Sequence, residues 1–222
     1  MSAVDLVIFD FDGTLADSAR GITACMGAAF ASFALAAPSL PDVRVRIGMT
    51  LEEAIRQLIR DRRDVDIAAV AHRYRELHVA VAAPETTLFP GVDGTLALLN
   101  DAGIRMLVVS QKARKGLVQL LNQLDIARHF ELVLGSDEVS AAKPHAALFD
   151  RHIAPRYAEI ARDRVLVVGD TDIDLRFAAN IGARSCWVEY GYGHARSCRA
   201  QQPTYTIADI TALPRVCGVA AP

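Results

Sequence analysis

The sequence has little lysine, little net charge and no long apolar run. Only three of its 24 basic residues are lysine, namely Lys112, Lys115 and Lys143. A net charge of −2 argues against a nucleic-acid binder that works through excess positive charge. No stretch approaches the roughly 20 apolar residues of a membrane-spanning helix, and the first residues do not form a basic and apolar leader. We therefore expect a cytoplasmic protein that binds neither membrane nor nucleic acid.

The four cysteines, Cys25, Cys186, Cys198 and Cys217, are scattered and form no Cys-x-x-Cys pair. This pattern argues against a disulfide framework and against a zinc site of the usual spacing. The chain also lacks internal repeats and low-complexity segments. Its 222 residues, 52% of them hydrophobic, suffice for one large domain or two smaller ones with a sizeable core.

The pattern of residues 17–83 predicts helices and no strand. The predicted helices cover residues 22–33, a segment that begins at Thr50, and residues 67–81. Ser18 is the candidate N-cap of the first helix, and Pro38 and Pro41 are expected to end it. Thr50 begins a capping-box pattern in front of the second helix.

Strands and helices alternate from residue 88 onward. The predicted strands cover residues 104–109, 132–134, 165–168 and 185–188, with helices at 92–102, 113–124 and 145–153 and a short one after Leu175. Such alternation is typical of βαβ units and of a mostly parallel sheet. The apolar run at residues 4–9 is expected to join that sheet, so the helical segment is an insertion after the first strand.

Polar residues follow each predicted strand. In chain order they are Asp10, Asp12 and Thr14, then Ser110, Gln111 and Lys112, then Lys143 after a loop, then Asp170, Asp172 and Asp174. Parallel sheets carry their functional loops at the carboxyl ends of the strands. If the strands are neighbours, one edge collects acids that can hold Mg²⁺, and a hydroxyl and a lysine that can hold phosphoryl oxygens. This set of groups indicates phosphoryl transfer.

The first of these motifs is Asp10-Phe11-Asp12-Gly13-Thr14. Two carboxylates two residues apart at the end of a buried strand repel one another unless a cation lies between them. A plain turn is the alternative, because Asp and Gly are common turn residues. A calcium loop of the EF-hand type is excluded, because Gly13 directly follows the second acid and a strand precedes the motif.

Taken together, four motifs resemble the haloacid dehalogenase (HAD) superfamily, in particular its phosphoglycolate phosphatases with a helical cap. They are Asp10-Phe11-Asp12-Gly13-Thr14-Leu15-Ala16-Asp17-Ser18, Ser110-x-Lys112, Lys143-Pro144 and Gly169-Asp170-Thr171-x-x-Asp174. The resemblance implies an α/β fold, a Rossmann-like parallel sheet core with an inserted all-helical cap domain. The core would comprise residues 1–16 and 84–222, and the cap residues 17–83.

The resemblance also implies a Mg²⁺-dependent hydrolase of small phosphate monoesters such as phosphoglycolate. Asp10 would be the nucleophile that forms an aspartyl-phosphate, and Asp12 the general acid and base. Mg²⁺ would be held by Asp10, the backbone carbonyl of Asp12 and Asp170. Asp174 would support the metal site or bind the ion directly. The alternative for Asp174 is an acid that stabilises a helix N-terminus.

By the same resemblance, Ser110, the backbone amide of Gln111, Lys143 and Thr14 would bind the phosphoryl group. Gln111 departs from the family pattern, which usually has asparagine there, so a substrate contact from its side chain does not carry over. We expect Lys112 and Lys115 on the exposed start of a helix.

Two other functions stay open. One is a phosphosugar mutase of the β-phosphoglucomutase kind, which tends to carry a histidine and a lysine in the cap. The cap segment here has no lysine, and its histidines lie far along the third predicted helix. The other is a catalytically silent binding or regulatory protein on the same scaffold. Arg44 and Arg46 are candidates for binding a substrate carboxylate. We expect a monomer or a homodimer. The molecule that it binds is expected to be the small phosphate ester.

Overall fold

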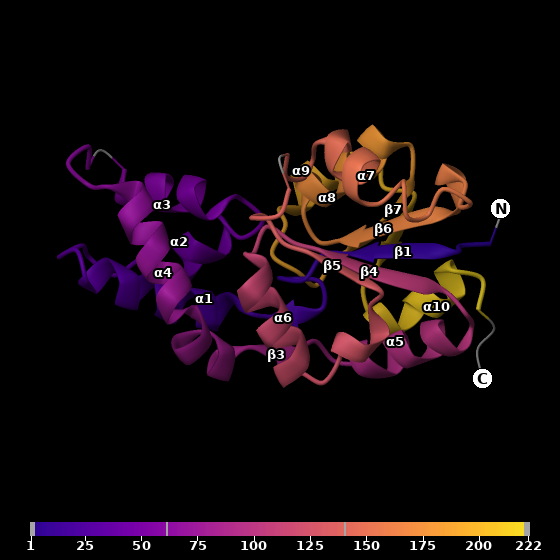
Figure 1. Ribbon diagram of the computed structural model, residues 1–222, viewed down its shortest axis with the longest axis horizontal. Helices are drawn as coiled ribbons and strands as arrows, with labels where there is room; N and C mark the ends of the chain where they lie inside the picture. Colours follow the sequence, from indigo (N-terminus) through magenta and orange to yellow (C-terminus); the bar gives the residue numbers. More distant parts are fainter. Residues whose placement is uncertain (1–2, 61, 140, 220–222) are drawn as a thin grey trace.

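The computed structural model describes residues 3–60, 62–139 and 141–219 and shows a parallel sheet with a helical cap beside one end (Figure 1). Six parallel strands pair in the order β5-β4-β1-β6-β7-β8. They are β1 (Leu6–Phe9), β4 (Arg105–Val109), β5 (Leu132–Leu134), β6 (Val165–Gly169), β7 (Arg184–Val188) and β8 (Tyr205–Ile207). The predicted α/β class is confirmed.

Helices cover both faces of this sheet (Figure 1). On one face lie α5 (Val92–Asp101), α6 (Arg114–Gln123) and α10 (Leu213–Val216), and on the other α7 (Ala146–His152) and α8 (Asp172–Ile181), with α9 (Ala195–Ala200) following β7. In β1, Val7 and Phe9 pack into the core under α5 and α6, whereas Leu6 and Ile8 pack toward α7 and α8. The strand is buried on both faces, which explains its uninterrupted apolar sequence.

In the described part of residues 17–83, four α-helices form the cap. They are α1 (Ala19–Ala31), α2 (Leu40–Arg44), α3 (Leu51–Ile59) and α4 (Ile67–Val81). Their apolar faces meet in a separate core that includes Phe30, Ile55 and Val70. Burying side chains of this size stabilises the cap by roughly 1.5–3 kcal/mol each. The chain enters and leaves the cap through an antiparallel pair, β2 (Ala16–Asp17) and β3 (Thr87–Leu88).

Several local predictions for this segment were wrong in detail. Asp17 belongs to a strand, although the segment was predicted to hold none. Pro41 lies in the first turn of α2 and does not end a helix, because proline needs no hydrogen-bond partner for an N–H there. Thr50 caps α3 as predicted, accepting from the amide of Glu53.

Ser18 stands at the N-cap position of α1, but its side chain does not cap the helix. The hydroxyl oxygen of Tyr192 takes that place and accepts hydrogen bonds from the amides of Ser18 and Ala19 at 2.8 and 3.1 Å. The same hydroxyl donates to Asp17 at 2.7 Å. A core loop therefore holds the first turn of the cap.

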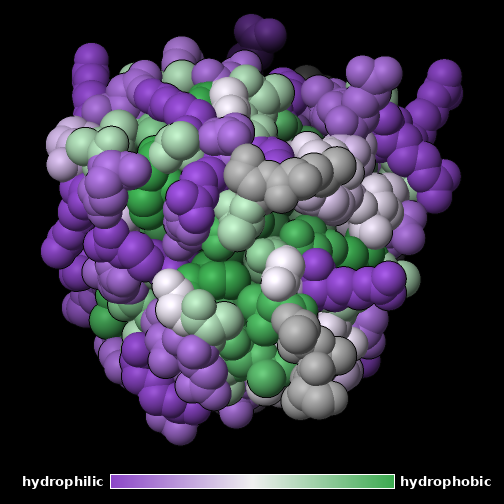
Figure 2. Space-filling view, turned by 90° about the vertical axis from the view of Figure 1, so that its right-hand side faces the viewer, coloured by the Kyte–Doolittle hydropathy of each residue, from purple (hydrophilic) through white to green (hydrophobic). Residues whose placement is uncertain are grey.

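The carboxyl ends of the strands face the cap, and the two chain ends lie at the opposite end of the molecule (Figure 1). Figure 2 shows that opposite face, where hydrophobic residues gather in the middle and hydrophilic ones surround them. In the part of the chain that the structure describes, no helix has the length and apolar character needed to span a membrane.

Candidate active site

Three neighbouring strands bring the predicted site residues together. Asp10 follows β1, Ser110 follows β4 and Asp170 follows β6, and β1 lies between the other two strands. The strand hydrogen bonding continues for one residue beyond β1 and β4. Asp10 N donates to Val168 O at 2.9 Å, and Ser110 N donates to Leu134 O at 3.1 Å. The backbone of the sheet therefore fixes the positions of both residues.

Lys143 comes from the loop between β5 and α7 and lies between two carboxylates. Its Nζ is 2.7 Å from Asp10 Oδ1 and 2.6 Å from Asp174 Oδ1, and 4% of its side chain is exposed. Although burial disfavours the ammonium, the charges of Asp10 and Asp174 raise the pKa of Lys143 above its ordinary value. Lys143 is therefore a permanent cation beside Asp10. The Gln111 side chain donates to the Lys143 carbonyl at 3.1 Å and so supports this loop.

Two of the clustered acids ionise with difficulty. Burial, opposed by Lys143 and reinforced by Asp174, raises the pKa of Asp10 from 3.8 to about 7. Burial and the charges of Asp10 and Asp174 raise the pKa of Asp170 well above its ordinary value. Raised pKa values of this kind are expected where several carboxylates are buried together without enough positive charge.

The carboxylates of Asp10, Asp170 and Asp174 offer oxygens that all lie within 4.8 Å of one another. Asp170 accepts from Thr14 Oγ1 at 3.2 Å and from the Tyr192 amide at 2.7 Å. Both hydrogen bonds favour the ionised carboxylate, but they do not outweigh burial and the charges of Asp10 and Asp174. A buried all-oxygen cluster of this kind fits a hard divalent cation.

Asp174 uses both of its oxygens in protein contacts. Oδ2 accepts from the Thr171 amide at 3.1 Å and from its hydroxyl at 2.7 Å, which completes a capping box at the start of α8. Oδ1 pairs with Lys143. The predicted short helix after Leu175 in fact begins at Asp172, so Asp174 stabilises its first turn.

The Gly191-Tyr192-Gly193 loop, together with Gly13, closes tightly around Asp170. A Cβ at Gly191 would lie 2.2 Å from the Asp170 Cβ, and one at Gly193 would lie 1.9 Å from its backbone oxygen. At Gly13 the φ angle is +84°, and a Cβ would lie 2.3 Å from Asp170 Oδ2. These glycines allow the backbone to approach Asp170 and hold it in place.

Asp12 is held from two sides. Ser18 Oγ donates to Asp12 Oδ1 at 2.5 Å, and the Lys112 Nζ lies 3.3 Å from Oδ2. The expectation that Lys112 lies exposed at the start of a helix was wrong, since 8% of its side chain is exposed. It precedes α6 and points inward because a buried acid attracts its ammonium. Lys115, one turn further, is exposed as expected.

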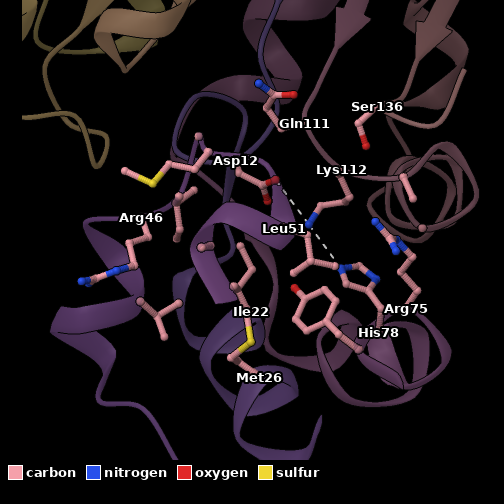
Figure 3. A pocket seen from close by; sticks show the side chains of 18 of the residues that line it. Asp12, Ile22, Met26, Arg46, Leu51, Arg75, His78, Gln111, Lys112 and Ser136 are labelled. Atoms are coloured by element: carbon pink, nitrogen blue, oxygen red, sulfur yellow. Dashed lines mark hydrogen bonds and ion pairs between the residues drawn. The ribbon is translucent and has the colours of Figure 1, made fainter. Parts of the chain in front are cut away.

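A cavity of about 490 Å³ opens between cap and core beside Asp12 (Figure 3). Apolar cap side chains such as Ile22, Met26 and Leu51 make up much of its wall. The polar lining includes Arg46, His78 and Lys112. The cavity is of a size that binds small organic molecules.

A smaller hollow of about 10 Å³ lies at the carboxyl ends of the strands. Its lining includes Gly48 of the cap and six predicted site residues, namely Asp10, Asp12, Ser110, Gln111, Lys143 and Asp174. Ser110 is buried, and its hydroxyl accepts from the Lys112 amide at 3.2 Å. Thr14 is fully buried and directs its hydroxyl to Asp170.

The model of the haloacid dehalogenase-like hydrolase family matches residues 7–188. The chain therefore belongs to this family. A phosphoglycolate phosphatase of Pseudomonas fluorescens (strain Pf0-1) is 30% identical over 214 residues, covering 94% of this chain and 78% of the relative. A phosphoglycolate phosphatase of Pectobacterium atrosepticum is 30% identical over 225 residues, covering 96% and 93%.

Among solved structures, a haloacid dehalogenase-like family hydrolase from Streptococcus pneumoniae has a TM-score of 0.84 at 24% identity. The superposition covers 97% of this chain and 99% of that chain. This likeness concerns the fold, the parallel core with its helical cap. The predicted family, fold and class of enzyme, a phosphoric monoester hydrolase, are thus confirmed.

Proposed function

We propose that the protein is a Mg²⁺-dependent phosphatase that hydrolyses small phosphate monoesters through an aspartyl-phosphate on Asp10. The observation that carries the proposal is the meeting of Asp10, Asp12, Ser110 and Lys143 around one small hollow. In that hollow the Lys143 ammonium lies beside the nucleophile, where negative charge builds up on the transferring phosphoryl group.

Two displacements at phosphorus make up the proposed reaction. In the first, an Asp10 oxygen bonds to phosphorus, the ester P–O bond breaks, and the leaving oxygen takes a proton from Asp12. In the second, Asp12 takes a proton from water as the water oxygen bonds to phosphorus. The bond to Asp10 then breaks and phosphate is released. Ser110, the Gln111 amide and Lys143 hold the phosphoryl oxygens in both steps.

Asp10, Asp170 and the backbone carbonyl of Asp12 are the proposed Mg²⁺ ligands, because the Asp10 and Asp170 carboxylates belong to the buried cluster. When bound, Mg²⁺ neutralises charge on the carboxylates and on the phosphoryl oxygens. Asp174 supports the site by anchoring Lys143, and Thr14 supports it by orienting Asp170.

The comparisons support phosphoglycolate as the first substrate to test, because the relatives cited above are named for it.

We further propose that residues 17–83 act as a cap domain over a core of residues 1–16 and 84–222. The β2–β3 pair then serves as the joint between them. The test is phosphate release from 2-phosphoglycolate, p-nitrophenyl phosphate and sugar phosphates, with and without Mg²⁺.

Metal-dependent release from one or more of these esters supports the proposal. Absence of release from every ester by folded, Mg²⁺-supplied protein contradicts it. An assay for phosphosugar isomerisation then tests the mutase alternative. If the wild-type protein has neither activity, the result favours the catalytically silent scaffold.

Arg46 and Arg44 differ in their surroundings, and we expect their alanine variants to differ too. Arg46 lines the large cavity, whereas Arg44 packs on the Tyr192 ring at 5.1 Å and donates to the Gly191 carbonyl at 3.3 Å. Arg46→Ala should raise KM for phosphoglycolate by about 5–20-fold with little change in kcat, since it removes a positive charge from the cavity. Arg44→Ala is the matched control. Equal KM values for Arg46→Ala and wild type would exclude Arg46 from substrate binding.

Stabilisation by Mg²⁺ should depend on pH. The pKa of Asp10 is raised from 3.8 to about 7, so the folded state without metal holds a proton that the unfolded chain releases. The free energy of unfolding of the metal-free protein therefore falls as the pH rises from 3.8 to about 7. Mg²⁺ binds the ionised carboxylates and should raise Tm more at about pH 7.5 than at about pH 5. Asp170→Asn should remove most of this increment. An increment that is the same at both pH values would contradict metal binding by these acids.

A further inference from the structure

The Lys112 ammonium joins the cap to the acid that the proposed mechanism uses as proton donor. Its Nζ lies 3.3 Å from Asp12 Oδ2 and 3.2 Å from Nε2 of His78. Lys112 precedes α6 in the core, whereas His78 lies near the end of α4 in the cap. Figure 3 shows Asp12, Lys112 and His78 in succession along the cavity wall. The contact is a bridge from cap to core that ends on Asp12.

His78 is a neutral acceptor in this bridge. An ammonium only donates, so Nε2 accepts and the ring hydrogen resides on Nδ1. Burial and the positive charge of Lys112 also lower the pKa of His78 to about 3. A neutral imidazole accepts a hydrogen bond from the ammonium and orients it. The ion pair between Lys112 and Asp12 is left intact.

Packing fixes the His78 ring but does not explain why the residue is histidine. The residue is 4% exposed, and its ring lies 5.7 Å from that of Tyr74. The core helix leaves room for it, since a Cβ at Gly116 would lie 3.0 Å from Nδ1. Among the described residues, Nδ1 has no hydrogen-bond partner. A buried N–H without a partner is costly, and an apolar side chain would avoid that cost. The bridge to Lys112 is the contact that requires an imidazole.

The positions of both Asp12 carboxylate oxygens thus depend on residues at the beginning and near the end of the cap segment. Ser18, which holds Oδ1, directly precedes α1, and His78, which acts through Lys112 on Oδ2, lies near the end of α4. We propose that Lys112 and His78 are positioning residues that place the Asp12 carboxyl for proton transfer when the cap is seated on the core. This inference rests on the proposed role of Asp12 in the phosphatase reaction.

The proposal has a consequence that depends on the leaving group. An alkyl ester such as phosphoglycolate leaves as a strongly basic alkoxide and needs the proton from Asp12. A nitrophenolate leaves without a proton. A misplaced Asp12 should therefore slow the first displacement far more for the alkyl ester than for the aryl ester. The second displacement is the same for both esters and does not enter kcat/KM. General damage to the fold or to the phosphoryl site should slow both.

The test compares kcat/KM for phosphoglycolate and p-nitrophenyl phosphate in His78→Leu and Lys112→Met. We expect kcat/KM for phosphoglycolate to fall about 10–100-fold and kcat/KM for p-nitrophenyl phosphate to fall less than about threefold. His78→Gln should recover most of the loss, because its amide oxygen can accept from Lys112. His72→Leu is the matched control on α4, since His72 is 76% exposed in its side chain and pairs with Glu76. If Lys112→Met does not fold, His78→Leu, which removes no charge, decides the result.

Equal losses on the two esters in His78→Leu, or no loss on either, would overturn the positioning role. The bridge itself has a readout that does not depend on activity. Long-range ¹H–¹⁵N NMR spectra should show His78 as the neutral Nδ1–H tautomer in the wild type and a changed tautomer balance in Lys112→Met. An Nε2–H tautomer in the wild type would overturn the bridge. A wild type that hydrolyses neither ester would refute the proposed function, and the positioning role with it, while the spectra still decide on the bridge.

Discussion

Asp10→Asn should lower kcat for every phosphate ester by at least about 10⁴-fold. The substitution keeps the size and shape of the side chain but replaces the attacking carboxylate oxygen with an amide that cannot form a stable bond to phosphorus. Lys143, Ser110 and Asp12 keep their places around the hollow, so the loss should appear in kcat and not in substrate binding. Steady-state phosphate release measures it.

The stability of the Asp10→Asn protein shows whether activity is lost because the nucleophile is missing or because the protein is unfolded. Because burial raises the pKa of Asp10 to about 7, the ionised carboxylate destabilises the metal-free fold at neutral pH. The amide should leave the free energy of unfolding unchanged or higher. The matched control is Asp172→Asn, whose carboxylate pairs with Arg176 at 3.0 Å, and we expect it to retain activity within about threefold. A variant at Asp10 that keeps more than a few per cent of wild-type kcat would refute the nucleophile assignment.

Lys143→Met should have the second largest effect, because it acts on both activity and stability. The substitution leaves Asp10 and Asp174 buried without the ammonium that lies within 2.7 Å of each. Removing one partner of a buried ion pair costs about 3–5 kcal/mol, so we expect a loss of that order at neutral pH. The phosphoryl oxygens lose a positive charge at the same time, and kcat should fall by about 10³-fold.

Denaturant unfolding and phosphate release measure the two effects on the same protein. Lys115→Met is the control for stability, because Lys115 is exposed, and its free energy of unfolding should change by less than about 0.5 kcal/mol. Lys143→Arg should recover stability better than activity, since a planar guanidinium keeps the charge but not the compact shape. Unfolding free energies that match for Lys143→Met and wild type would contradict the role of Lys143 as the partner of both acids.

The core and the acidic part of the site could be predicted because their signals are local in sequence. Uninterrupted apolar strands predict a buried parallel sheet, and the residue after each strand is then brought to one edge. Asp10, Ser110 and Asp170 follow this rule, and the sheet order β4-β1-β6 places them side by side. Lys143 was predicted in the site from its motif, whereas the position of Lys112 beside Asp12 was not predicted.

Contacts between cap and core could not be predicted, because they depend on how two packed units meet. His78 has no sequence signature, and it reaches Lys112 only once α4 lies against α6. Ser18 matches an N-cap pattern, yet its hydroxyl goes to Asp12 because Tyr192, 174 residues further on, takes the capping position. Local propensity gives way to tertiary contacts at these places, and each of them adjoins the candidate active site.

Trapping the phosphorylated enzyme would test the central claim most directly. Wild-type protein would be mixed with Mg²⁺ and 2-phosphoglycolate, or with the best ester of the panel, quenched in acid within milliseconds, digested and analysed by mass spectrometry. The account predicts one phosphoryl group on the peptide that contains Asp10, and none in Asp10→Asn. With p-nitrophenyl phosphate, whose leaving group needs no proton, the phosphorylated fraction should increase in Asp12→Asn, because that variant slows the second step. Turnover without a phosphorylated peptide, or with the phosphoryl group on another residue, would contradict it.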